Sequence, residues 1–172
     1  MPTVGHIIRP LTPTDEPFLW EMLYQAIHVQ DGEPPLPRTI INEPEISRYV
    51  LHWGSEGDEG LIAIDGTTAK PIGAIWIRLF KPDNKGYGYV DDQTPEISMA
   101  VLPGHRNRGV GSALLSQLID LVDGRYSSLS LSVSRTNPAA RLYKRFGFEI
   151  IGERDGSLTM MRSLVEQNES SS

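Results

Sequence analysis

Apolar and polar side chains alternate in several short segments of the chain, and this period of two predicts β-strands. The segments are 4–9, 61–65, 72–79, 96–101, 129–133, 148–153 and 157–162. In 96–101, Ile97, Met99 and Val101 share one face, and Glu96, Ser98 and Ala100 share the other. The last two segments flank Asp155-Gly156, which is typical of a tight hairpin turn.

Helical spacing of apolar residues predicts helices between these strands. The clearest covers 109–122, with an apolar stripe made of Val110, Ala113, Leu114, Leu118, Leu121 and Val122. A first helix follows Thr14-Asp15, with Pro17 in its first turn. A second is predicted over 43–53, and a short one over 138–146 with Asn137 as its cap and Gly147 as its stop. Strands and helices in this mixed order predict an α/β (α+β) fold with a mixed sheet.

Two segments interrupt the periodic pattern. The stretch 31–38 contains three prolines and predicts an irregular loop. The stretch 80–93 is rich in turn residues and predicts a long hairpin connection. Loops of this kind often carry or cover binding sites.

Composition restricts the classes of function. The 172 residues predict one domain over 1–166 and a disordered tail over 167–172. The net charge of −6 argues against nucleic acid as a partner. With no cysteine, the chain cannot form disulfides, thiolate metal sites or an acyl-cysteine, and the four isolated histidines predict no metal. We expect a cytoplasmic protein without membrane contact, because no leader-like or membrane-length apolar run is present.

The segment 101–112, VLPGHRNRGVGS, combines a strand end, a loop rich in Gly and Arg, and the start of the best helix. The first-turn amides of a helix lack partners inside it and, with the helix dipole, attract anions. Arg106 and Arg108 add charge that suits phosphate oxygens. A Walker A loop is excluded because no Gly-Lys-Ser/Thr is present, and a dinucleotide fingerprint fails because Leu114 occupies the third glycine position.

The segment resembles the coenzyme A loop of the GCN5-related N-acetyltransferase (GNAT) family. Arg106, Gly109 and Gly111 match the motif Gln/Arg-x-x-Gly-x-Gly/Ala at its three specified positions. A second segment, 137–148 with the sequence NPAARLYKRFGF, is similar to the family's Asn-x-x-Ala segment that ends in Gly-Phe. The resemblance is strong over 96–153 and rests on element order alone over 1–93. It implies a single domain with a mostly antiparallel mixed sheet of about seven strands and about four helices. Parallel strands 96–101 and 129–133 would splay apart to hold CoA.

The resemblance also implies an acyl-CoA-dependent transfer of an acetyl group from acetyl-CoA to a primary amine, by direct attack in a ternary complex. Backbone groups of two strand residues would pair with the pantetheine arm, the loop would hold the pyrophosphate, and Asn137 and Tyr143 would also contact CoA. The strand residues are Met99 and Val101, and the loop residues are Arg106, Arg108, Gly109, Val110, Gly111 and Ser112.

Two residues are the candidate catalytic groups. Tyr143 would protonate the leaving thiolate, since an ordinary phenol has a pKa of about 10 against about 8.5 for a thiol. Glu96 would be the general base, acting through water. The alternatives are a core aromatic for Tyr143 and an arginine-paired strand-end carboxylate for Glu96. Asp91 and Asp92 are weaker base candidates that suit a hairpin turn.

The motifs do not identify the amine that accepts the acetyl group. Acidic Asp31, Glu33, Asp91 and Asp92 favour a cationic amine, either a small molecule or a peptide. Dimers are common in the family, so a homodimer is a further expectation. A CoA-binding or regulatory module that has lost catalysis is the alternative function, and the presence of both Glu96 and Tyr143 favours the enzyme.

Overall fold

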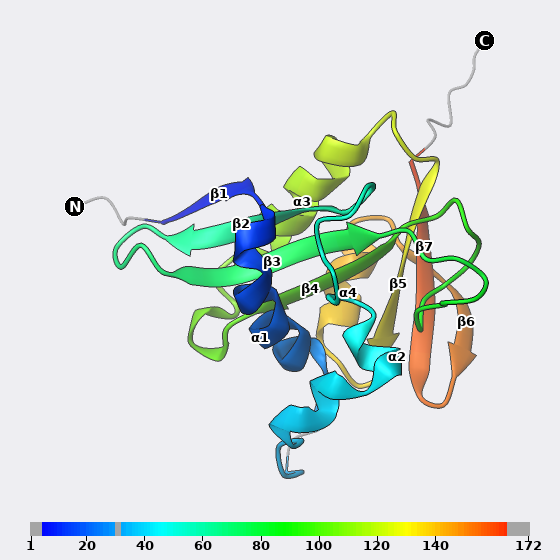
Figure 1. Ribbon diagram of the computed structural model, residues 1–172, viewed down its shortest axis with the longest axis horizontal. Coiled ribbons are helices and arrows are strands. Elements are labelled where there is room, and N and C mark those ends of the chain that lie inside the picture. The colour runs from blue at the N-terminus through cyan, green and yellow to red at the C-terminus, as the bar shows by residue number, and fades with distance from the viewer. Residues whose placement is uncertain (1–4, 30–31, 165–172) are drawn as a thin grey trace.

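The computed structural model describes residues 5–29 and 32–164 of the chain (Figure 1). The predicted tail 167–172 and Asp31 lie outside these residues. The strands and α-helices are, in chain order, β1 (His6–Pro10), α1 (Glu16–Ala26), α2 (Pro44–Ser47), β2 (Glu59–Asp65), β3 (Pro71–Arg78), β4 (Glu96–Val101), α3 (Val110–Val122), β5 (Ser128–Ser134), α4 (Ala139–Arg145), β6 (Glu149–Arg154) and β7 (Ser157–Ser163).

The strands form one seven-stranded sheet in the order β1-β2-β3-β4-β5-β7-β6. Strands β4 and β5 are parallel, and the other neighbours are antiparallel. At the β6–β7 hairpin, Asp155 and Gly156 have φ angles of 52° and 81°, as a type I′ turn requires. The predicted fold class, a mixed and mostly antiparallel sheet in a single α/β domain, is confirmed.

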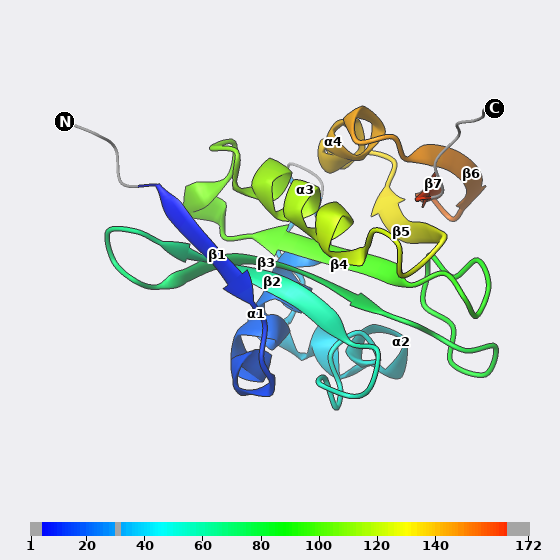
Figure 2. The same cartoon turned by 90° about the horizontal axis from the view of Figure 1, so that it is seen from above.

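Helices cover both faces of the sheet. Helices α3 and α4 lie on one face and α1 and α2 on the other (Figure 2). Each face has its own apolar cluster, one built around α3 and one around α1 and the segment that follows α2. On α3 the buried residues are Val110, Leu114, Leu115, Leu118 and Val122. Leu121 of the predicted stripe is 37% exposed, because helical spacing alone does not decide which side of an apolar-rich helix meets the sheet.

The helix predicted over 43–53 is wrong in its length. A 3-10 helix at Arg38–Asn42 precedes this segment, which itself forms the single turn α2 and then further turns. Side chains of β3 take carbonyls that a continuous helix would use: Arg78 donates to Arg48 O at 2.8 Å and to Leu51 O at 2.7 Å, and Trp76 Nε1 donates to Tyr49 O at 2.9 Å. These tertiary hydrogen bonds replace helical ones.

None of the helices within the described residues is long and apolar enough to cross a membrane.

Candidate functional site

Strands β4 and β5 are neighbours that separate almost at once. They pair at a single position, Glu96 with Ser130, where Ser130 N donates to Pro95 O at 3.0 Å. Beyond it, β4 stays paired with β3 up to Val101, and β5 stays paired with β7 up to Ser134. The two strands therefore enclose the gap that the family resemblance predicts.

The register shows which backbone groups face this gap. Leu102 N donates to Ile72 O at 2.8 Å, so the backbone groups of Leu102 point toward β3. Backbone groups of successive residues in a strand point to opposite sides, so those of Ser98 and Ala100 also point toward β3. Met99 and Val101 consequently direct their amides and carbonyls toward β5. Arg106 Nε donates to Val101 O at 2.8 Å from that side. The two residues predicted to pair with a pantetheine arm thus have backbone groups on the side of the gap.

The predicted phosphate loop joins the end of β4 to α3. Gly109 caps the helix with φ 83°, in the left-handed region where glycine is favoured. The first turn of this 13-residue helix, Val110 to Ser112, leaves amides without helical partners. Arg106 and Arg108 are exposed beside it, although Arg106 also donates to Gln25 at 3.3 Å. A Cβ atom at Gly111 would lie 3.6 Å from Met99 Cε, so the helix start packs beside β4.

Tyr143 lies on α4, two residues before the helix ends at Arg145. Phe148 N donates to Tyr143 O at 3.1 Å and Gly147 N to Lys144 O at 3.0 Å, with Gly147 at φ 91°, which is a Schellman motif. The rings of Tyr143 and Phe148 meet edge to face at 5.8 Å. Burial raises the pKa of Tyr143 above its ordinary value, so the phenol is a protonated donor at neutral pH, and a weaker acid than the sequence-based argument assumed.

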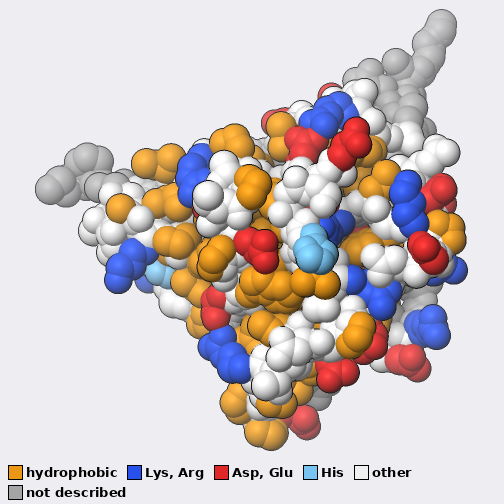
Figure 3. Space-filling view, viewed as in Figure 1, with side chains coloured by type: hydrophobic (Ala, Val, Ile, Leu, Met, Phe, Trp, Pro, Cys, Tyr) orange, Lys and Arg blue, Asp and Glu red, His pale blue; other side chains and the backbone are white. Residues whose placement is uncertain are grey.

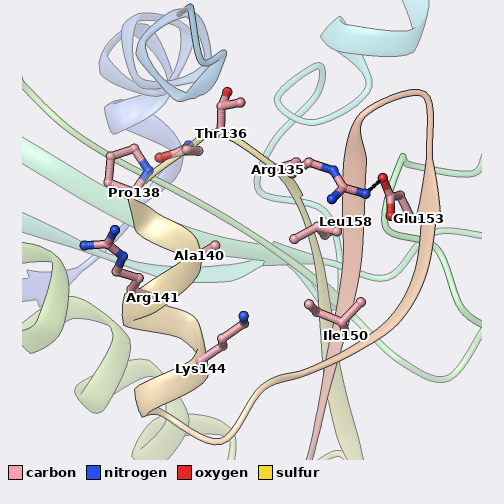
Figure 4. Close-up of a pocket in the computed structure, with 10 residues that line it drawn as sticks. Arg135, Thr136, Pro138, Ala140, Arg141, Lys144, Ile150, Glu153 and Leu158 are labelled. Atoms are coloured by element: carbon pink, nitrogen blue, oxygen red, sulfur yellow. Dashed lines mark ion pairs between the residues drawn. The ribbon is translucent and has the colours of Figure 1, made fainter.

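Asn137 precedes α4 and caps it, with Oδ1 accepting from Ala139 N at 2.9 Å. It also lines a cavity of about 520 Å³ between α4 and the β6–β7 hairpin. Arg141 and Lys144 of α4 also line this cavity, and Figure 4 shows Lys144 directed toward the β6–β7 hairpin, while Arg135 pairs with Glu153. Among the residues that line the cavity, Asn137 is the one that the sequence predicted as a site residue.

Glu96, the first residue of β4, is buried with 3% of its surface exposed. Its Oε2 accepts a hydrogen bond from the Tyr49 hydroxyl at 2.6 Å. Burial raises the pKa of Glu96 to about 7, while the Tyr49 hydroxyl and, more weakly, the Gly88 amide and the Arg48 charge oppose the shift. No arginine forms an ion pair with Glu96 in the described part of the chain. A carboxyl with this pKa can exchange a proton near neutrality.

The connection 80–93 packs closely over Glu96. A Cβ atom at Gly86 would lie 2.3 Å from Glu96 Oε1, and one at Gly88 would lie 2.5 Å from the carbonyl carbon of Leu131 on β5. Asp91 and Asp92, the weaker base candidates, are exposed on this connection, and Asp91 Oδ1 accepts from Gln93 N at 2.9 Å in a local turn.

Glu96 and Tyr143 lie on opposite faces of the sheet. Tyr143 belongs to the apolar cluster of α3, and Tyr49, the partner of Glu96, belongs to the cluster of α1. Tyr49 is absent from the sequence-based predictions, and no motif or spacing could have identified it, because it is 47 residues from Glu96.

No group of three or more metal-binding side chains is found within residues 5–29 and 32–164.

Comparisons with known proteins agree with this geometry. A family model described as an acetyltransferase (GNAT) domain matches residues 57–150, more than half of the chain. The chain is 29% identical over 150 residues to an uncharacterised protein of Mycobacterium leprae, a match that covers 86% of this chain and 36% of that protein. It is 44% identical over 50 residues to the L-amino acid N-acetyltransferase AaaT of Escherichia coli, covering 27% of this chain and 31% of that enzyme. The matches thus span about a third of the length of these two relatives.

The fold is also shared with solved structures. The protein yncA of Salmonella typhimurium, solved with its cofactor acetyl-CoA, superimposes with a TM-score of 0.62 at 20% identity, covering 97% of this chain and 98% of that one.

Proposed function

The chain belongs to the acetyltransferase (GNAT) domain family, and from that premise we propose that it transfers an acetyl group from acetyl-CoA to a primary amine. The observation that carries the proposal is the separation of β4 from β5. The candidate base, Glu96, lies where the two strands are still paired, and the candidate acid, Tyr143, lies on the opposite face of the sheet.

In the proposed arrangement, the pyrophosphate of acetyl-CoA lies on the first turn of α3. The amides of Val110, Gly111 and Ser112, together with Arg106 and Arg108, would bind its oxygens. The pantetheine arm would occupy the gap and pair with Met99 and Val101. An amide there would also stabilise negative charge on the thioester oxygen.

Glu96 accepts a proton from the ammonium form of the acceptor, through a water molecule because its own oxygens are covered. The neutral nitrogen attacks the acetyl carbonyl, so that a C–N bond forms and the C–S bond breaks. The Tyr143 hydroxyl gives its proton to the departing thiolate. The acylated nitrogen then loses its second proton, which returns through water to the Tyr143 phenolate, and Glu96 releases the first proton to solvent. No covalent enzyme intermediate is needed, which agrees with the absence of cysteine.

We propose a cationic amine as the acceptor, on the strength of Glu33, Asp91 and Asp92. On the face shown in Figure 3, acidic and basic side chains are interspersed rather than gathered in one acidic field. On the sequence grounds given above, we also propose a cytoplasmic location.

Two measurements test the function. Isothermal titration should show acetyl-CoA binding, and no heat at millimolar ligand would overturn the proposal. A screen of amines by release of free thiol should then find turnover, with cationic amines ahead of neutral and acidic ones. Binding without thiol release for any amine would favour the regulatory CoA-binding module instead.

A further inference from the structure

The Tyr49 hydroxyl has two partners that together determine its direction. It accepts a hydrogen bond from Tyr87 N at 2.6 Å and lies 2.6 Å from Glu96 Oε2. Because the backbone amide can only donate, the phenolic proton of Tyr49 is the one available for the Glu96 carboxylate. The hydroxyl is therefore oriented as a donor toward Glu96.

Tyr49 is held in place on every side. Its ring meets Phe80 edge to face at 5.1 Å and stacks on Tyr87 at 6.5 Å. Its carbonyl accepts from Trp76 Nε1 at 2.9 Å, and Arg78 donates to the carbonyls of Arg48 and Leu51 on either side of it in the chain. With 7% of its surface exposed, Tyr49 has little freedom to leave Glu96.

The other oxygen of Glu96 is in a different situation. Oε1 is buried without a hydrogen bond of ordinary geometry, and so is Oγ of Ser130, its register neighbour on β5. Gly86 covers Oε1 with backbone alone, since a Cβ atom there would lie 2.3 Å from it. One carboxylate oxygen is thus bound to Tyr49, and the other has no hydrogen-bond partner of ordinary geometry among the described residues.

We propose that Tyr49 is a positioning residue for the transfer reaction: it binds Oε2, favours the ionised carboxylate, and leaves Oε1 as the atom that accepts the proton. This inference rests on the proposed function, in which Glu96 is the base.

The surroundings of Glu96 leave Tyr49 as its principal polar partner. The Gly88 amide and the charge of Arg48 contribute weaker attractions, and Arg78 on the neighbouring strand is already paired with Asp58 at 3.0 Å. On the β5 side Ser130 cannot ionise, and on the connection 80–93 the ring of Tyr87 is mostly exposed. Burial raises the pKa of Glu96 and the Tyr49 hydroxyl lowers it, so removal of that hydroxyl should raise the pKa further.

Tyr49→Phe tests the proposal. The acid limb of the pH profile of kcat/KM should move up by about one pH unit, with the rate recovered at alkaline pH. Tyr126→Phe is the matched control, because it removes a phenol from a partly buried residue in the other apolar cluster. A lower rate with an unmoved acid limb would assign Tyr49 a merely structural role and overturn the inference.

A second readout is independent of turnover. The carboxyl carbon of Glu96, followed by ¹³C NMR, should titrate about one unit higher in Tyr49→Phe than in the wild type and in Tyr126→Phe. If Glu96→Gln keeps the wild-type rate, the proposed base is wrong, while this titration still decides whether Tyr49 controls the carboxyl. Equal titration midpoints in the three proteins would overturn the inference.

Should Tyr49→Phe not fold, Gly86→Ala gives the same readout. Its methyl group would displace both Glu96 Oε1 and the Tyr49 hydroxyl, which lies 2.6 Å from that Cβ position. The midpoint should again rise, and an unchanged midpoint in this variant would count against the proposal.

Discussion

The predicted phosphate loop and the buried surroundings of Glu96 lie at the two ends of β4, yet they are built differently. The loop and helix start use consecutive residues, 106–112, and would bind an anion through helix-terminal amides and exposed arginines. The surroundings of Glu96 draw on four segments, represented by Tyr49, Gly86, Glu96 and Ser130. A site made of consecutive residues can be recognised in the sequence, whereas the contacts around Glu96 change the pKa of one acidic group by burial. Changes around Glu96 should therefore alter protonation and chemistry, and changes in the loop should alter affinity.

The largest expected effect is on the pH dependence of stability through Glu96. Below pH 4.5 folded and unfolded chains both hold the proton, and between pH 4.5 and about 7 the folded chain alone keeps it. The free energy of unfolding therefore falls as pH rises through this window, by about 3 kcal/mol in total for a shift of this size. Glu96→Gln should abolish that loss, as urea unfolding at pH 5, 6, 7 and 8 would show.

The phosphate loop supplies the control for this experiment. Arg108→Gln should unfold in parallel with the wild type at each of the four pH values, because Arg108 is exposed and is in none of the ion pairs of the described residues. A stability difference between wild type and Glu96→Gln that stays constant from pH 5 to 8 would contradict the burial argument.

The next effect concerns Tyr143 on the opposite face of the gap. Tyr143→Phe should lower the single-turnover rate by about 100-fold, because the leaving thiolate loses its proton donor. Acetyl-CoA affinity should stay within about twofold, since the Schellman motif and the contact with Phe148 use the backbone and the ring. An unaltered single-turnover rate would remove Tyr143 from the mechanism and leave it as a core aromatic.

The smallest effect is expected in the loop. Arg108→Gln should weaken acetyl-CoA binding by about 10-fold at low salt and by less at high salt, with the rate at saturation unchanged. Isothermal titration at two ionic strengths measures this. Arg154→Gln in the β6–β7 turn, with a 92% exposed side chain, is the control for a general loss of positive charge. Equal weakening in both variants would point to the overall field rather than to a phosphate contact.

A change at Arg106 should affect both the predicted phosphate loop and the end of β4. It binds Val101 O and Gln25 in addition to flanking the loop, so Arg106→Gln should disturb the backbone at the end of β4 as well as affinity. A loss confined to affinity, measured beside Arg108→Gln, would show that these bonds are replaceable.

Most of the strand pattern was predictable, and the reasons are local. The alternation of apolar and polar residues predicted strand 96–101 with its observed bounds, and Asp155-Gly156 predicted the β6–β7 turn. Both signals depend only on a few neighbouring residues. The helix over 43–53 was not predictable in its true form. Its apolar spacing is compatible with a helix, and only the donors of Trp76 and Arg78 show why the chain turns there.

The sequence by itself determined the predicted phosphate loop, the strand and helix that flank it, and the family to which these motifs belong. It did so because glycine geometry, helix-terminal amides and short-range periodicity are properties of neighbouring residues. The tertiary structure alone decided that Glu96 is buried and that Tyr49 is its partner. Those features depend on contacts between residues far apart in the chain, and burial in such contacts is what raises the pKa of Glu96 to about 7.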